Sequence, residues 1–195
     1  IKLCERKGYP LLMLGGGSNT IFATSMFEGV VVQLNSPVFQ GMEAIKPNVI
    51  RVGAGSKLTG LLSYSRKVDM MGLEFCTMIP GTVGGALAGN AGAGNWGLCD
   101  FVDSVLVMTR DGEIGELRRN EFRYSYRHSD LSQYIILEAE VRLEKYVEEI
   151  SKTRSREFRD KKKTQPYSMP NTGCIFKNPI DPATGKIVSA GKLID

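Results

Sequence analysis

Short hydrophobic runs separated by polar and glycine-rich turns dominate the first half of the chain. The runs 11–14, 30–34 and 49–52 predict three short strands, the first of them buried. Residues 57–70 follow a helical period instead, and an amphipathic helix is expected there. Its predicted face consists of Leu58, Leu61, Leu62 and Ser65.

The middle of the chain predicts a hairpin and a further strand. Residues 102–109 and 113–117 are apolar runs that flank Arg110-Asp111-Gly112, a strong turn sequence. Residues 134–143 alternate apolar and polar positions, as a strand does. Strands that pair through turns, with few intervening helices, indicate an α+β fold rather than a doubly wound parallel sheet.

A more highly charged helix is predicted for residues 147–163. Val147, Ile150 and Phe158 fall on one helical face, most other positions are polar or charged, and Gln165-Pro166 ends the pattern. We interpret this segment as a bridge into a second region that opens at about residue 166.

Composition places the chain among folded proteins and limits its partners. Of 195 residues, 42% are hydrophobic and 24% are charged, which is typical of a globular protein rather than a disordered one. Apolar runs fall short of the roughly 18 residues of a membrane span, so no membrane association is expected. A net charge of +4 favours a small anionic ligand over nucleic acid. No obligate protein partner is indicated.

The four cysteines and the single histidine offer little metal chemistry. The cysteines form no C-x-x-C pair, so no metal site is expected. Scattered free thiols also suit a reducing, intracellular compartment. Because His128 is the single histidine, a Ser-His-Asp catalytic triad is not expected, and His128 is interpreted as a polar filler. Three cysteines are assigned to packing, namely Cys4, Cys76 and Cys99.

Glycine is enriched, with 22 residues, and it gathers in two segments. The first, residues 15–19, follows a predicted strand, and the second runs from Ile79 to Gly94. Without a Cβ atom a backbone can approach a ligand closely, and consecutive N–H groups can cradle a phosphate. The first segment lacks the Walker and Rossmann spacings. Either segment alone could be a sharp turn, whereas the two together favour a binding site for a dinucleotide.

Two further positions could take part in chemistry. Arg127 lies among aromatic residues, where it could clamp a carboxylate or stack on a tyrosine at the surface. Cys174 follows Gly173 in a polar loop and could be a nucleophile, a proton donor or a small buried thiol. The lysines at 161–163 are interpreted as a solvated helix end, with attraction of phosphate as the alternative.

The order of these motifs resembles the UDP-N-acetylenolpyruvoylglucosamine reductase family of bacterial cell-wall synthesis. The resemblance spans residues 11–194 and rests on Leu-Gly-Gly-Gly-Ser-Asn, Ile-Pro-Gly-Thr-Val-Gly-Gly with Asn-Ala-Gly-Ala, Tyr-Arg-x-Ser, Gly-Cys-Ile-Phe-Lys-Asn-Pro and Ala-Gly-Lys-Leu-Ile. It implies an α+β fold with a two-lobed FAD-binding region of the vanillyl-alcohol-oxidase type and a smaller substrate domain. The implied parts are a remnant of the first lobe (1–28), the second lobe (29–146), a helical bridge (147–165) and the start of the substrate domain (166–195).

The same resemblance implies a reaction. FAD would take a hydride from NADPH and pass it from N5 to the enolpyruvyl double bond of a UDP-sugar, giving UDP-N-acetylmuramate for peptidoglycan. Arg127 would stabilise the enolate that forms, and Cys174 would donate the proton. Tyr126, Lys177 and Asn178 would bind the UDP-sugar. The residues implied to hold FAD are Gly15, Gly16, Gly17, Ser18, Asn19, Gly81, Thr82, Gly84, Gly85 and Ala91.

The sequence departs from the family pattern at two points. Family members usually carry serine where Cys174 stands, although a thiol is the stronger acid and can still deliver a proton. The family's opening segment and its late catalytic glutamate have no counterpart in residues 1–195, so the chain is expected to be part of a longer, cytoplasmic bacterial protein. The alternatives are another FAD-dependent sugar or aldonolactone oxidase, and a non-catalytic nucleotide-binding fragment.

Overall fold

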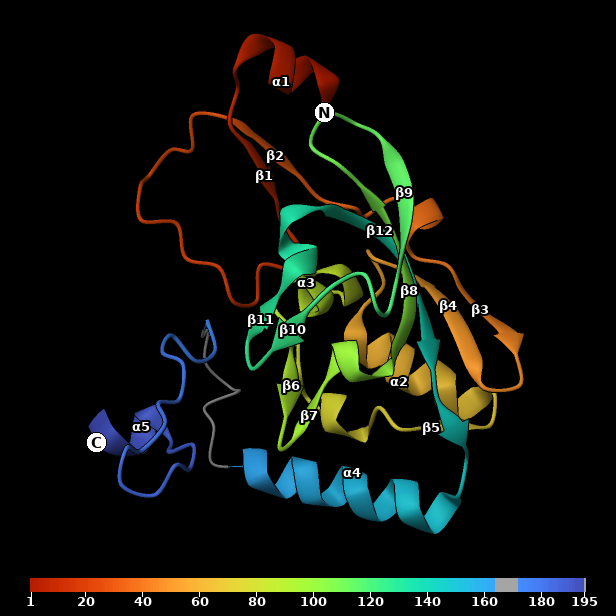
Figure 1. The fold of residues 1–195 in the computed structure, drawn as a ribbon. Helices are drawn as coiled ribbons and strands as arrows, with labels where there is room; N and C mark the ends of the chain where they lie inside the picture. The colour runs from red at the N-terminus through yellow and green to blue at the C-terminus, as the bar shows by residue number, and fades with distance from the viewer. Residues whose placement is uncertain (164–171, 195) are drawn as a thin grey trace.

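The computed structural model describes residues 1–163 and 172–194 (Figure 1). A five-stranded sheet in the order β3-β4-β12-β8-β9 forms its centre, and all neighbouring strands are antiparallel. Because these strands pair through turns and pack against helices, the expected α+β fold is confirmed. The strands are β3 (Met42–Lys46), β4 (Val49–Gly53), β8 (Val102–Met108), β9 (Ile114–Arg118) and β12 (Ile135–Arg142).

The central sheet has one apolar face and one charged face, as the alternation of side chains along a strand requires. Ile50 of β4 and Val141 of β12 are fully buried in the core. Arg51 points the other way and reaches Glu138 and Glu140, with N–O distances of 3.4 and 3.1 Å. This alternation sets the register, since a slip of one residue would bury the charges.

Helices α2 (Leu58–Lys67) and α3 (Val83–Ala88) pack against the core. The predicted face of α2 is confirmed, because all four of its residues are buried. Helix α3 is not predicted by the sequence pattern, and it forms inside the second glycine segment. Thr82 starts this helix, since its hydroxyl accepts a hydrogen bond of 3.3 Å from the N–H of Gly85.

The predicted hairpin joins β8 to β9, and Gly112 adopts a φ of 89° in its turn. A residue with a Cβ atom rarely takes this conformation, which explains the strength of the turn signal. At the opposite edge of the sheet, strand β3 is not predicted by the sequence pattern. Its residues are half-buried or exposed without a clear alternation, so no strand period marks it.

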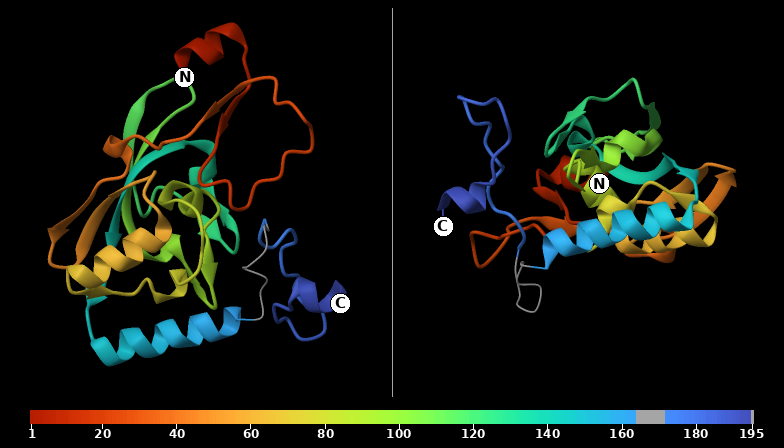
Figure 2. Two further views of the ribbon diagram at one scale, coloured as in Figure 1. Left: turned by 180° about the vertical axis from the view of Figure 1, so that it is seen from behind. Right: turned by 90° about the horizontal axis from the view of Figure 1, so that it is seen from below.

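A small N-terminal layer lies beside the tip of the β8–β9 hairpin (Figures 1 and 2). It consists of α1 (Lys2–Lys7) and a parallel pair of strands, β1 (Leu11–Met13) and β2 (Val30–Val32). Lys2 forms an ion pair of 3.7 Å with Glu113 of the hairpin. The prediction that β1 is buried is wrong, because the strand is half-buried and lines a cavity instead of the core.

Helix α4 (Glu148–Lys162) is the predicted charged helix, but of the three predicted face residues Phe158 packs against the core and the other two do not. Val147 and Ile150 are 46% and 41% exposed, whereas the buried residues of α4 are Ser151 and Ser155. The helix crosses the lower edge of the body in Figure 1. Its role as a bridge into a substrate domain stays a prediction, and the predicted stop at Gln165-Pro166 lies outside the described residues.

Hydrogen bonds, rather than apolar side chains alone, attach α4 to the body. Ser151 donates to the Glu74 carboxylate over 2.7 Å, and the guanidinium of Arg66 donates to Ser155. Phe158, further along the same face, packs against the core. An apolar period could not identify this face, because its first two contacts are serines.

Short elements complete the described part of the chain. Within residues 1–163 and 172–194, no helix has the length and apolar character needed to cross a membrane, and no group of histidine, cysteine and carboxylate side chains could hold a metal ion. The short strands are β5 (Met70–Met71), β6 (Gly92–Ala93), β7 (Trp96–Gly97), β10 (Tyr124–Ser125), β11 (His128–Ser129) and β13 (Glu144–Lys145). The remaining helices are η1 (Pro37–Phe39), η2 (Glu74–Cys76), η3 (Leu98–Phe101), η4 (Asp130–Gln133) and α5 (Ala190–Ile194).

Candidate cofactor and substrate site

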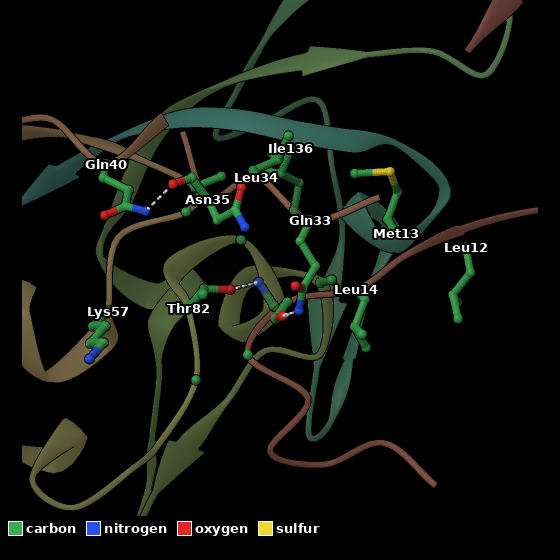
Figure 3. A pocket seen from close by; sticks show the side chains of 18 of the residues that line it. Leu12, Met13, Leu14, Gln33, Leu34, Asn35, Gln40, Lys57, Thr82 and Ile136 are labelled. Atoms are coloured by element: carbon green, nitrogen blue, oxygen red, sulfur yellow. Dashed lines mark hydrogen bonds between the residues drawn. The ribbon is translucent and has the colours of Figure 1, made fainter. Parts of the chain in front are cut away.

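A cavity of about 910 Å³ lies between the N-terminal layer and the central body (Figure 3). Its walls come from β1, from the residues that directly follow β2 and β4, from α3 and the loop before it, and from β12. This volume is near the upper end of the roughly 300–1,000 Å³ that is typical of ligand pockets. Much of the wall consists of glycine and apolar side chains, among them Leu12, Met13, Leu34 and Ile136.

The two glycine segments meet at this wall. A Cβ on Gly15 would lie 2.8 Å from Oγ1 of Thr82, and a Cβ on Gly16 would lie 3.0 Å from Cα of Gly81. Only residues without a side chain allow the two backbones to approach so closely. Of the predicted cofactor residues, the structure brings six together in the cavity wall, namely Gly15, Gly16, Gly81, Thr82, Gly84 and Gly85.

Four predicted cofactor residues do not line the cavity: Gly17, Ser18, Asn19 and Ala91. Ser18 remains close, because a Cβ on Gly81 would lie 2.9 Å from its Oγ. Ala91 donates its N–H to the carbonyl of Ala86 over 2.7 Å. Contact of these four with a cofactor stays a prediction.

The cavity lining is electropositive. Among the lining residues in the described ranges, Lys57 and Arg110 are the charged ones, and there is no carboxylate. Arg110 donates to the carbonyl of Leu11 over 3.1 Å, which ties the β8–β9 turn to β1. An anionic ligand such as a diphosphate fits this balance of charge.

Sequence reasoning missed the polar side chains of the wall. Gln33 donates to the carbonyl of Gly15 over 2.9 Å, and Gln40 donates to that of Asn35 over 2.7 Å (Figure 3). Gln33 carried one available signal, since it is a polar residue in the run Val-Val-Val-Gln-Leu. Lys57 and Arg110 stand at predicted element ends, where a charge is ordinary and gives no signal.

Arg127 occupies the tip of the two-residue hairpin between β10 and β11 and has a φ of 54°. Its guanidinium donates to the carbonyls of Gly92 and Asn90, over 2.8 and 3.5 Å, and lies 5.1 Å from the ring centroid of Tyr126. The alternative in which Arg127 stacks on a tyrosine is therefore confirmed for Tyr126. In addition, the hydrogen bonds of Arg127 go to the backbone of the second glycine segment. Arg127 forms no ion pair with a carboxylate in the described part of the chain.

The interpretation of the three lysines as a solvated helix end holds for Lys161 and Lys163, which are exposed, but not for Lys162. Its side chain is half-buried, and Nζ donates to the carbonyl of Thr77 over 2.8 Å. Burial lowers the pKa of Lys162; the Cys76 thiol opposes that shift, and the nearby charge of Arg127 lowers the pKa further. Two cations therefore lie near each other, both held by backbone carbonyls.

The segment around Cys174 approaches the first glycine segment. A Cβ on Gly173 would lie 3.3 Å from Oδ1 of Asn19. Cys174 is exposed, so the buried-thiol alternative is wrong, whereas the other three cysteines are buried as expected. Lys177 is also exposed, and Oδ1 of Asn178 accepts a hydrogen bond of 3.0 Å from the first N–H of α5.

The structure thus brings the predicted residues together in two groups. One group is the glycine wall of the cavity, and the other is Arg127 with Tyr126 and the Asn90–Gly92 backbone. No hydrogen bond joins Cys174 to Arg127 in the ranges 1–163 and 172–194. Their cooperation in one reaction stays a prediction.

The chain matches a known class of flavoprotein domain. Residues 1–118, more than half of the chain, match the family described as FAD binding domain. The chain belongs to this family of FAD-binding domains.

Within that class, the chain is similar to UDP-N-acetylenolpyruvoylglucosamine reductases, which confirms the resemblance noted from its motifs. It is 36% identical to the reductase of Chlamydia abortus, over 99% of this chain and 64% of that protein. It is 33% identical to the reductase of Myxococcus xanthus, over 99% of this chain and 63% of that protein. The chain therefore spans about 63% of the length of these relatives.

Solved structures support the same grouping. The reductase of Thermus caldophilus superposes with a TM-score of 0.78 at 29% identity, covering 98% of this chain and 68% of that one. Cholesterol oxidase from Brevibacterium sterolicum superposes with a TM-score of 0.57 at 14% identity, covering 74% of this chain and 31% of that one. The second match shows a shared fold alone.

Proposed function

We propose that this chain forms the FAD-binding region and the beginning of the substrate site of a UDP-N-acetylenolpyruvoylglucosamine reductase. The observation that carries the proposal is the cavity in which two glycine segments and two cations converge, with no carboxylate among the described residues that line it. The similarity to the reductases over nearly the whole chain supports the same assignment. The proposal keeps the predicted division into residues 1–28, 29–146, 147–165 and 166–195.

The residues of the cavity fit FAD. The glycine backbone at 15–16 and 81–85 leaves room for a diphosphate, and Lys57 and Arg110 supply compensating charge. When bound there, FAD would supply hydride transfer from NADPH to the enolpyruvyl double bond of the UDP-sugar. NADPH as donor and a cytoplasmic location belong to the proposal, and the four free cysteines suit a reducing compartment.

Arg127 would bind the enolpyruvyl carboxylate and stabilise the charge that develops beside it. Addition of hydride to the double bond builds negative charge on the carbon next to that carboxylate, and a fixed cation stabilises such charge. The guanidinium is already held by two carbonyls, which favours one orientation. Lys162 would add to the positive potential, since its charge and that of Arg127 interact.

Cys174 would complete the reaction by donating its thiol proton to the same carbon. The thiol is exposed, and its neighbour Gly173 lies against Asn19 of the first glycine segment. Tyr126, Lys177 and Asn178 would hold the UDP-sugar. Lys177 is exposed and could reach a phosphate, while Asn178 keeps its amide nitrogen for a ligand when its oxygen caps α5.

Visible spectroscopy of the complete reductase that contains this chain, with added FAD, tests the proposal. We expect a bound flavin spectrum that bleaches with NADPH and returns, without oxygen, on addition of enolpyruvyl-UDP-N-acetylglucosamine. Cys174→Ala should still bleach but should not return, whereas Cys174→Ser, which keeps a proton donor, should recover much of the return. Bleaching that no enolpyruvyl substrate reverses in the unmodified protein would overturn the proposed reaction.

A further inference from the structure

Asn90 connects two parts of the candidate site that lie far apart in the sequence. It is only 6% exposed, and its φ of 42° lies in the left-handed region, which asparagine tolerates better than most residues. Its Nδ2 donates to the carbonyl of Ser125 over 2.9 Å, and its Oδ1 accepts from the N–H of Cys99 over 3.1 Å. Both ends of the amide are therefore in use.

The bond to Ser125 acts directly on the hairpin that carries Arg127. Ser125 is the last residue of β10, and the two residues that follow it form the hairpin tip. From this tip Arg127 reaches back to the carbonyls of Asn90 and Gly92. The contacts close a ring that runs from the Asn90 amide to Ser125, along the chain to Arg127, and back to the Asn90 backbone.

The hairpin tip needs such support. Arg127 adopts a φ of 54°, which a residue with a Cβ atom keeps only when the surrounding contacts hold it there. Two further bonds close the base of the hairpin, from the N–H of Arg123 to the Asp130 carboxylate and from the N–H of Asp130 to the Arg123 carbonyl. Nearer to the tip, the Asn90 amide is the side chain that bonds the backbone of β10.

We propose that Asn90 is a positioning residue that holds Arg127 in its reactive orientation, an inference that rests on the proposed role of Arg127. Three requirements coincide at this position: a left-handed backbone, a donor toward Ser125 and an acceptor for Cys99. Aspartate keeps the acceptor but sets a carboxylate oxygen against the Ser125 carbonyl. Glycine keeps the backbone conformation but provides neither hydrogen bond.

Hydrogen exchange tests the positioning role without any substrate. Asn90→Asp should raise the exchange rate of amides in residues 123–130 about tenfold, because a buried hydrogen bond is lost there. The 98–101 segment should change less, since the acceptor for Cys99 remains. Ser151→Ala, which removes a buried hydrogen bond at α4, is the matched control and should leave the hairpin unchanged. Unaltered hairpin exchange in Asn90→Asp would overturn the inference, as would equal acceleration in the control.

A double-mutant cycle tests the catalytic consequence. Anaerobic return of flavin absorbance with enolpyruvyl-UDP-N-acetylglucosamine should slow about tenfold in Asn90→Asp. The same substitution should have less than a roughly twofold effect in an Arg127→Ala background. Equal slowing in both backgrounds would show that Asn90 does not act through Arg127. If the unmodified protein shows no return, the proposed function fails, and hydrogen exchange still decides whether Asn90 orders the hairpin.

Discussion

Gly16 faces Gly81 across the wall of the cavity, so closely that a Cβ on residue 16 would lie 3.0 Å from the Cα of residue 81. The two glycines belong to segments that are distant in the sequence and to different layers of the fold. The N-terminal layer and the body therefore touch here through backbone atoms. The candidate cofactor cavity lies along this line of contact.

Gly81→Ala should weaken FAD binding at least about tenfold. Residue 81 has a φ of 107°, which strains any residue with a Cβ atom, and the added Cβ would lie 2.9 Å from Oγ of Ser18, so the backbone or the Ser18 side chain must shift. Titration of FAD, followed by its fluorescence, measures the change. Gly115→Ala is the control, because its Cβ would meet nothing within 4 Å. Equal affinity in the two variants would show that the cavity wall does not hold the cofactor.

The two cations of the cavity should contribute to FAD affinity through charge. Lys57→Gln and Arg110→Gln should each raise the Kd for FAD about twofold to fivefold, and added salt should reduce the difference. Lys67→Gln removes an exposed cation at the other end of α2 and should have no effect. A salt-independent loss would mean that the side chains act by packing instead of charge.

Only one thiol should react rapidly with Ellman's reagent in the native protein. Cys174 is exposed, while Cys4, Cys76 and Cys99 are buried. Cys174→Ser should abolish the fast phase, and denaturation of that variant should release the other three thiols. A fast phase that survives in Cys174→Ser would contradict the burial of the remaining cysteines.

Much of the fold follows from local sequence patterns. The apolar period of α2 and the Arg110-Asp111-Gly112 turn predict their elements because each depends on residues close in sequence. The contact face of α4 could not be predicted, since Ser151 and Ser155 gain their partners only from the tertiary packing. The place of Lys162 against Thr77 depends on the same packing.

The residues of the candidate site likewise fall into some that the sequence predicts and others that only the fold brings into place. The glycine motifs mark six residues of the cavity wall, because a close approach of backbones demands glycine wherever it occurs. Gln40 and Asn35 are ordinary loop residues in the sequence and become wall residues only when β2 and η1 are in place. The same holds for Asn90, whose partners are set by the fold.

The Cys99 thiol should make stability depend on alkaline pH. Burial is the main cause that raises the pKa of Cys99 to about 11, while its contact with Ser129 opposes the shift. In the unfolded chain a thiol loses its proton near pH 8.5. Between about pH 8.5 and 11 the unfolded state therefore binds fewer protons, and the contribution of Cys99 to the free energy of unfolding falls as pH rises.

Urea denaturation of the unmodified protein and of Cys99→Ala checks this prediction. The difference between their free energies of unfolding should decrease by about 1–2 kcal/mol from pH 7.5 to pH 10. Subtracting the variant removes the contributions of other groups that titrate in this range. A difference that stays constant across these pH values would show that the thiol is not buried in solution.

The serine contacts of α4 have a thermodynamic consequence. Val147 and Ile150 are already exposed to water, so lifting the first turns of the helix away from the body uncovers little apolar surface. The heat capacity of such an opening is then small, and denaturant promotes it only weakly, because both quantities scale with newly exposed area. Local opening of the first turns of α4 should therefore contribute amide exchange that is nearly independent of urea, whereas exchange from α2 should require the denaturant-sensitive unfolding of the core.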